Sequence, residues 1–338
     1  MTPAPRPLSD AVVDHLRAIA DLPDLAGSKY EVLDVLGRGG MGTVYRARDH
    51  ELDREVALKV LNEPAPEPSA AARLVEEARI LARLEHPGLV PVHDVGTLPD
   101  GRVFYVMRLV RGQGLDEHVR SVAALAGRLR LFERACEAVA FAHAHGVVHR
   151  DLKPDNIMVG PFGEVLVLDW GVAKRRGATA PPATGADTDA TSPGGTAHGT
   201  VLGTPGYMAP EQARGAAHAA DERADVYALG AILHFLLVGE APPETRPLPS
   251  LRARNPEVRR AMESVARQAL ALAPEDRYAT VAALAADVSA FLSDLPVRAH
   301  REGPLERAGR FLSRHRTPVA LVIAYLVMRA LLLFLTGR

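Results

Sequence analysis

The stretch "HRDLKPDN", residues 149–156, decides how this 338-residue sequence is interpreted. Its eight consecutive residues combine a histidine, an arginine, two aspartates, a lysine and an asparagine, and they follow a helical pattern. The stretch itself has no apolar periodicity, so it is expected to form a loop. A solvated loop could have this composition, but the order of the residues is highly specific and favours a loop that carries chemistry.

A second informative stretch, "VLVLDWGVAK", covers residues 165–174. An apolar, strand-like run ends in Asp169 and is followed by Trp170 and Gly171. Trp170 is the only tryptophan in the chain. The stretch therefore places an acid, a large aromatic residue and a flexible residue at the end of a buried strand.

Upstream, "GRGGMGTV" at residues 37–44 contains the pattern G-x-G-x-x-G, formed by Gly37, Gly39 and Gly42. Glycines allow the backbone to approach phosphate groups closely. The pattern alone is weak, because a flexible hairpin could have the same composition. The glycines lie between strand-like runs rather than at the start of a helix, which argues against a dinucleotide-binding fold.

The strand-like run "VALKV" is interrupted by a lysine, Lys59. Such a lysine either extends from a sheet edge to water or is held inside by an acid and an anion. The helical pattern that follows offers Glu76 or Glu77. Glu77 lies one turn before Leu81 and shares its inward face, so it is the predicted partner.

A fifth stretch, "GTPGYMAPEQ", covers residues 203–212. In this order and spacing, the five stretches resemble the eukaryotic-like (Hanks-type) serine/threonine protein kinase family, and their sequences are similar to those of its bacterial members. The resemblance covers Tyr30 to Leu295. It implies an α+β, bilobal protein kinase fold with a small β-rich N-lobe and a larger α-helical C-lobe.

The expected organisation follows from this resemblance and from the changes in pattern along the chain. An N-terminal extension (1–28) precedes a kinase domain (29–295), which divides into an N-lobe (29–111) and a C-lobe (112–295). A basic juxtamembrane linker (296–317) and a predicted transmembrane helix (318–336) follow.

The resemblance implies a role for each matching residue. Asp151 would accept the proton of the attacking hydroxyl, and Lys153 would neutralise the transferred phosphate. Lys59, oriented by Glu77, would hold the α- and β-phosphates of ATP. Asn156 and Asp169 would bind Mg²⁺, with Mn²⁺ as an alternative. The residues expected to surround ATP, besides Lys59, are Leu36, Gly37, Gly39, Gly42, Val44, Ala57, Met107, Val110 and Met158.

Other positions are structural or regulatory in the family. Glu211 is expected to pair with Arg277, and Asp225 to anchor the catalytic loop. Arg150 is expected to bind a phosphate on the activation loop, at Thr196 or Thr200, after autophosphorylation. The alternative is that this threonine-rich stretch is only a soluble linker.

The expected activity is transfer of the γ-phosphoryl group of ATP to serine or threonine hydroxyls of proteins, in signalling. A homodimer could support autophosphorylation. The alternative is a pseudokinase or scaffold that binds nucleotide without transfer, which the complete set of catalytic residues disfavours. The net charge of −1 gives no global basic field for nucleic acid, so none is expected as a partner. The single cysteine, Cys136, excludes an intramolecular disulfide.

The segment "PVALVIAYLVMRALLLFL" at residues 318–335 is apolar except for Arg329. At about 1.5 Å per residue it could nearly cross a hydrocarbon core of roughly 30 Å. Arginines in the preceding linker favour a cytoplasmic location for the kinase domain, tethered to the cell membrane by this helix. The alternative is an apolar helix that docks on the domain or on a partner.

Trp170 stands where the family most often has phenylalanine. It is expected to fill a hydrophobic column with Leu81, Val92 and His149. Because tryptophan fills more volume than phenylalanine, we expect it to hold the Asp169 segment in its inward, active position.

Overall fold

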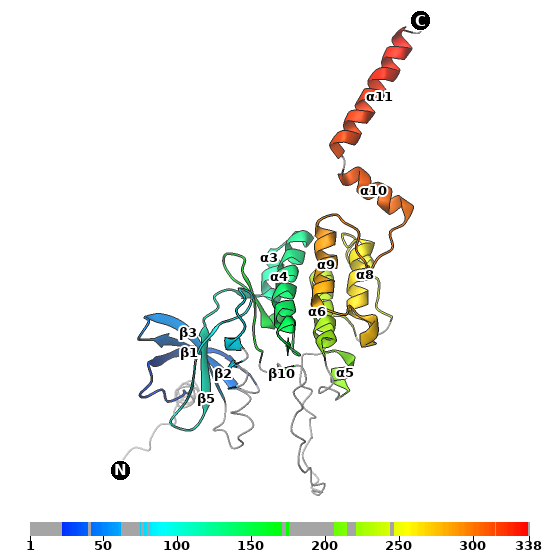
Figure 1. Ribbon diagram of the computed structural model, residues 1–338. Helices are drawn as coiled ribbons and strands as arrows, with labels where there is room; N and C mark the ends of the chain where they lie inside the picture. Colours follow the sequence, from blue (N-terminus) through cyan, green and yellow to red (C-terminus); the bar gives the residue numbers. More distant parts are fainter. Residues whose placement is uncertain are drawn as a thin grey trace, which may run out of the picture. The chain divides into compact units, whose positions relative to one another are not determined.

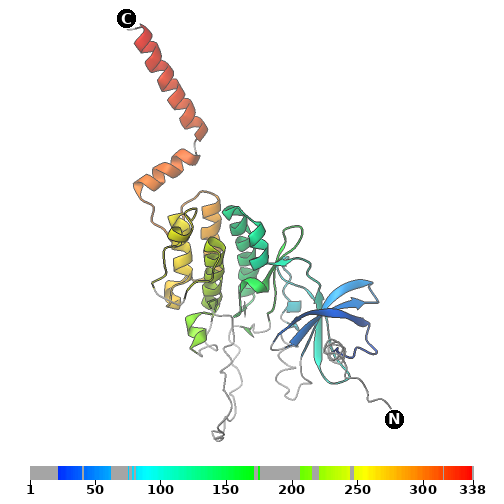
Figure 2. The same cartoon turned by 180° about the vertical axis from the view of Figure 1, so that it is seen from behind.

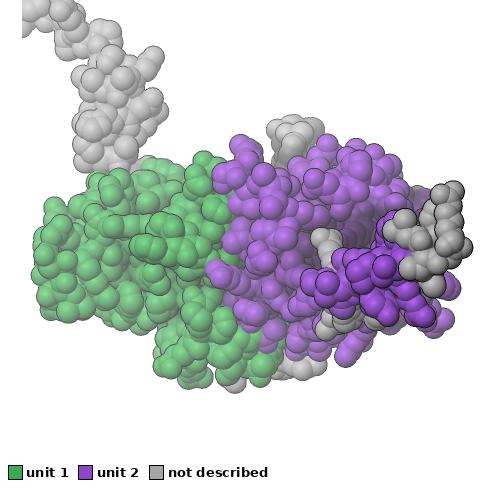
Figure 3. Space-filling view, turned by 90° about the horizontal axis from the view of Figure 1, so that it is seen from above, with its two compact units in different colours: residues 1–118, 141–150, 154–180 green, residues 119–140, 151–153, 181–338 purple. Residues whose placement is uncertain are grey.

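The structure is a computed structural model. It divides into two compact units: residues 1–118, 141–150 and 154–180 form unit 1, and residues 119–140, 151–153 and 181–338 form unit 2 (Figure 3). The residues that the structure describes are 22–39, 42–61, 75, 78–79, 81–170, 174–175, 206–214, 221–243, 247–314 and 316–336.

Unit 1 contains a five-stranded antiparallel sheet with the strand order β1-β2-β3-β5-β4 (Figure 1). The central strand, β3, is buried from Val56 to Leu61, as expected for a strand that is covered on both faces. The strands are β1 (Tyr30–Arg38), β2 (Gly42–Asp49), β3 (Arg54–Leu61), β4 (Val92–Thr97) and β5 (Val103–Arg108).

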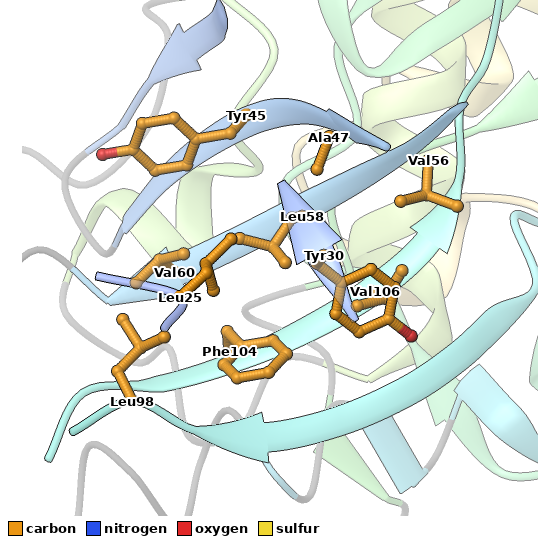
Figure 4. Packing of buried hydrophobic residues seen from close by; sticks show 10 residues of the cluster. All are labelled: Leu25, Tyr30, Tyr45, Ala47, Val56, Leu58, Val60, Leu98, Phe104 and Val106. Atoms are coloured by element: carbon orange, nitrogen blue, oxygen red, sulfur yellow. The ribbon is translucent and has the colours of Figure 1, made fainter. Parts of the chain in front are cut away.

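Alternation along β3 separates two apolar clusters, because successive side chains of a strand point to opposite faces. One cluster contains Leu58 and Phe104 and is shown in Figure 4. The other contains Leu61 and Tyr105, with Val92 and Met107 packed against it. The remaining members of the first cluster are Leu25, Tyr30, Tyr45, Ala47, Val56, Val60, Leu98 and Val106.

Short strands complete unit 1. A three-stranded sheet has the order β6-β8-β9, and β7 pairs with β10 in antiparallel fashion. The 3₁₀-helix η1 (Pro154–Asn156) leads directly into β8. The strands are β6 (Gln113–Gly114), β7 (Val147–Val148), β8 (Ile157–Val159), β9 (Val165–Val167) and β10 (Lys174–Arg175).

Two helices, α3 (Leu115–Ser121) and α4 (Leu125–Ala144), follow β6. Unit 2 is helical around α6 (Glu222–Val238), which is almost wholly buried and contacts α8 and α9 (Figure 2). Asp221 caps its N-terminus by accepting a hydrogen bond from the Arg223 amide, and Gly239 ends it at φ 85°. The other helices are α5 (Pro210–Ala213), α7 (Leu251–Arg254), α8 (Arg260–Ala269), η2 (Pro274–Asp276), α9 (Val281–Leu292), α10 (Pro304–Arg314) and α11 (Arg316–Thr336).

The predicted transmembrane helix over residues 318–336 is not supported. In the part of the chain that the structure describes, no helix is long and apolar enough to cross a membrane.

Candidate active site

The register of the large sheet places several predicted ATP-binding residues on one face. Directly opposed residues of neighbouring strands share a face, and Lys59 lies opposite both Val44 and Tyr105. Ala57 lies opposite Met107 in the same way. This face therefore carries the lysine together with the apolar side chains that were expected around adenine.

Lys59 is held by an acid that is distant in the sequence. Its Nζ lies 2.9 Å from Oδ1 of Asp169 and 5.7 Å from the centre of the Tyr105 ring. The lysine side chain is only 8% exposed, whereas that of Asp169 is 52% exposed. A buried ammonium group needs an anion and hydrogen bonds, and the carboxylate of Asp169 supplies both.

The backbone around Asp169 is fixed from two sides. The amide of Leu168 donates to the carbonyl of Asn156 at 2.8 Å, and the amide of Val167 donates to that of Gly88 at 2.9 Å. Asp169 has φ 56°, a left-handed conformation that is uncommon for a residue other than glycine. Such a strained conformation persists only where contacts with the surrounding structure stabilise it, and it is frequent at functional sites.

The Trp170 side chain is buried directly after this strained residue, with 1% of its surface exposed. Its Nε1–H donates to the carbonyl of Val167 at 3.2 Å, and its ring centre lies 4.6 Å from that of His149. Nε2 of His149 lies 2.9 Å from the carbonyl oxygen of Leu168, so this nitrogen carries the proton. The pair His149 and Trp170 forms part of the expected hydrophobic column; contacts of Trp170 with Leu81 and Val92 stay a prediction.

Asp151 and Lys153 lie in unit 2, with Nζ of the lysine 3.6 Å from Oδ2 of the aspartate. Leu152 between them is buried, and both charged side chains keep about a quarter of their surface exposed. Arg150, the preceding residue, has a left-handed backbone with φ 71°. The loop thus anchors itself through an apolar side chain and leaves its two charged groups accessible.

The predicted magnesium ligands both lie in unit 1. Asn156 is 7% exposed and ends η1, where its backbone accepts the bond from Leu168, one residue before Asp169. Among the described residues there is no group of three or more histidine, cysteine or acidic side chains that could hold a metal ion. A metal ion at this site would therefore depend on one carboxylate, one amide and oxygens from water or a ligand.

The three glycines Gly37, Gly39 and Gly42, at the end of β1, after it and at the start of β2, are not equivalent. A Cβ atom at Gly42 would lie 2.5 Å from the carbonyl oxygen of Val60, so the close approach of β2 to β3 requires glycine there. The amide of Gly39 donates to the carbonyl of Gly42 at 2.9 Å and closes the turn. Gly37 has open space around it, and Leu36 beside it is 50% exposed.

In unit 2, Arg277 is wholly buried and forms a bidentate pair with Glu211, with both N–O distances 2.7 Å. Its remaining donors bond to the backbone carbonyls of Arg223, Ala271 and Leu272. Burial favours a higher pKa for Glu211, but the hydrogen bonds from Arg277 hold this pKa below its ordinary value. This pair therefore joins the start of α5 to the segment after η2.

Three further predicted residues, Asp225, Met158 and Val110, lie in the described part of the chain. Asp225 is fully buried in the first turn of α6. Met158 and Val110 are half-buried in unit 1. Glu77, Thr196 and Thr200 lie outside the described residues. The sequence interpretation missed Tyr105, whose position opposite Lys59 depends on the strand register.

A buried lysine on the face of an antiparallel sheet, paired with an aspartate after a second sheet, is the arrangement expected of a protein kinase. Residues 30–295 match the protein kinase domain family, and the chain belongs to this family. The predicted α+β fold is therefore confirmed, with a five-stranded antiparallel sheet and a helical unit.

Among curated relatives, serine/threonine-protein kinase pkn3 of Myxococcus xanthus is 39% identical over 285 residues, covering 78% of this chain and 50% of the relative. Serine/threonine-protein kinase PknB of Mycolicibacterium smegmatis is 37% identical, covering 79% of this chain and 43% of the relative. The chain thus spans half or less of the length of these relatives. The solved PknI kinase domain of Mycobacterium tuberculosis is 27% identical with a TM-score of 0.59, covering 79% of this chain and 98% of that domain.

Proposed function

We propose that this protein is an ATP-dependent serine/threonine protein kinase of the bacterial type, acting in the cytoplasm on protein substrates. The ion pair between Lys59 and Asp169 is the observation that carries this proposal. It places a buried cation and a partly exposed carboxylate together, as the binding of a metal–nucleotide complex requires. The names of the curated relatives support the choice of serine and threonine.

Each residue would have a distinct task. Lys59 would exchange its carboxylate partner for the α- and β-phosphates of ATP, while Asn156 and Asp169 would hold the divalent cation, Mg²⁺ or Mn²⁺. The cation would neutralise phosphate charge. Asp151 would orient the substrate hydroxyl and take its proton, and Lys153 would stabilise the charge on the transferred group.

The experiment uses the full chain, labelled ATP, Mg²⁺ and a generic protein substrate. Asp151→Asn should lower phosphorylation by about a hundredfold or more, because it removes the proposed base. Asp155→Asn is the matched control: Asp155 is an exposed acid of the adjoining η1, and its replacement should leave phosphorylation nearly unchanged. A wild-type chain that binds ATP but transfers no label would refute the proposal and favour the pseudokinase alternative.

Autophosphorylation at Thr196 or Thr200, with Arg150 as the phosphate ligand and a homodimer as the acting unit, is also proposed. The left-handed backbone of Arg150, with φ 71°, sets the chain direction immediately before Asp151. Mass spectrometry of the chain after incubation with ATP tests this proposal. Full activity without phosphate on either threonine would refute it.

A further inference from the structure

Unit 1 contains a polar hollow of about 510 Å³ at one end of the large sheet. It lies where the turn between β2 and β3 approaches β4 and the end of β5. Four of the eight residues that line it are arginines, and only two are acids. The lining residues are Arg48, Asp53, Arg54, Glu55, His93, Arg108, Leu109 and Arg111.

The negative charge of the carboxylates around this hollow does not neutralise the positive charge of its arginines. Arg48 pairs with Asp53, and Nη2 of Arg111 lies 2.9 Å from Glu55. Arg54 reaches the buried Asp49, outside the lining, at 3.4 Å. Among the described residues, no carboxylate lies within ion-pair distance of the exposed Arg108. The hollow therefore keeps an uncompensated guanidinium group, whose five donors suit an oxyanion.

His93 lies in the same hollow because of an irregularity in β4. The pairing with β5 passes from Val92–Met107 to Asp94–Val106, so His93 is the extra residue of a β-bulge. Its Nε2 is 3.5 Å from Nη1 of Arg54. Burial lowers the pKa of His93, and nearby Arg54 lowers it further; Asp49 opposes this, and Arg108 adds a smaller lowering effect.

This hollow is separate from the face that carries Lys59. Arg108 lies opposite Val56, whereas Lys59 lies opposite Tyr105. Because neighbouring residues of a strand point to opposite faces, Arg108 and Lys59 project from opposite faces of the sheet. A ligand held by Arg108 would therefore not occupy the proposed nucleotide site.

We propose that this hollow, called here the Arg108 pocket, binds a phosphate group, either as free phosphate or as a phosphorylated serine or threonine of a protein segment. A phosphate dianion offers three or more acceptor oxygens, which suits converging guanidinium groups and an imidazole. The site does not depend on phosphoryl transfer by this protein. It would let the N-lobe bind an already phosphorylated segment.

The test follows the ring signals of His93 by ¹H–¹³C NMR in the full chain, with His93→Gln identifying them. The probes are inorganic phosphate, a phosphothreonine hexapeptide and the same peptide without phosphate. A shift caused by both phosphate probes, but not by the plain peptide, supports the pocket. Tighter binding of the phosphopeptide identifies a protein segment as the source, and equal binding identifies free phosphate.

Arg108→Gln should weaken phosphate binding about tenfold, because it removes one charge-assisted contact. Arg102→Gln is the matched control, since Arg102, just before β5, pairs with Asp100 at 2.6 Å and lies outside the pocket. Arg111→Gln serves as a second test if Arg108→Gln does not fold. No shift of His93, equal binding of the plain peptide, or unchanged affinity in the pocket variant would overturn the proposal.

Discussion

Replacing Trp170 by phenylalanine should loosen the segment that carries Asp169. The change removes the hydrogen bond from Nε1 to the carbonyl of Val167, which is 3.2 Å long and buried. It also shortens a ring that is 1% exposed and packs against His149. Both losses occur beside a residue whose left-handed backbone needs support.

The magnitude follows from these contacts. A buried hydrogen bond of this kind contributes about 1 kcal/mol. The lost ring atoms leave a partly filled space, which costs about 1–2 kcal/mol more in a close-packed interior. We therefore expect local opening of this segment to become easier by about 2–3 kcal/mol, a change of roughly 30-fold to 160-fold in the opening equilibrium.

Amide hydrogen exchange measures this opening directly. The amides of Val167 and Leu168 donate to the carbonyls of Gly88 and Asn156, so both should exchange faster in Trp170→Phe. Phe132→Leu, at a fully buried position of α4, is the control and should leave both amides unchanged. Nucleotide affinity and activity should fall together with protection. Equal protection of both amides in Trp170→Phe and wild type would refute the reasoning.

Two further variants test structural contacts. Glu211→Gln should lower the free energy of unfolding by about 3 kcal/mol at pH 7, since it leaves buried Arg277 without its anion. The pKa of Glu211 lies below its ordinary value of 4.5. The difference in free energy of unfolding between wild type and variant should therefore persist above pH 4.5 and shrink as the pH falls through the folded-state pKa. Urea titrations that give the same difference at every pH would contradict this. Gly42→Ala should lower the free energy of unfolding by about 1–3 kcal/mol, because its Cβ would clash with the carbonyl oxygen of Val60. Gly37→Ala, in open space, should lower it by less than about 1 kcal/mol. Equal urea midpoints for the two variants would contradict this.

The sequence predicted that Lys59 lies inside a strand, and the structure buries it in β3. The partner favoured by spacing along a helix, Glu77, lies outside the described residues and stays a prediction. The contact with Asp169 was not predicted, because local periodicity shows only neighbours on one element. Asp169 lies 110 residues away, and its contact depends on how β9 and the large sheet are placed in unit 1. Such a long-range pairing is decided by tertiary packing, which periodicity does not record.

The break between α3 and α4 is another feature that local patterns do not record. The residues between the two helices, 122–124, include no proline or glycine. Nε of Arg128 donates to the carbonyl of Val122 at 2.8 Å, and its Nη1 donates to that of Leu236 in α6. A side chain from the second helix thus satisfies a backbone group freed at the break, so the local sequence carries no stop signal.

The backbone strain at Asp169 explains why the large aromatic residue follows it. From the sequence, Gly171 is the flexible residue, yet the left-handed conformation falls on Asp169. A left-handed residue other than glycine costs about 1–3 kcal/mol and persists only where its neighbours determine it. Trp170 stabilises this backbone conformation through one buried hydrogen bond and its packing against His149. We predict that the tryptophan thereby keeps the carboxylate at the ammonium group of Lys59, so that it positions a charged group rather than reacting.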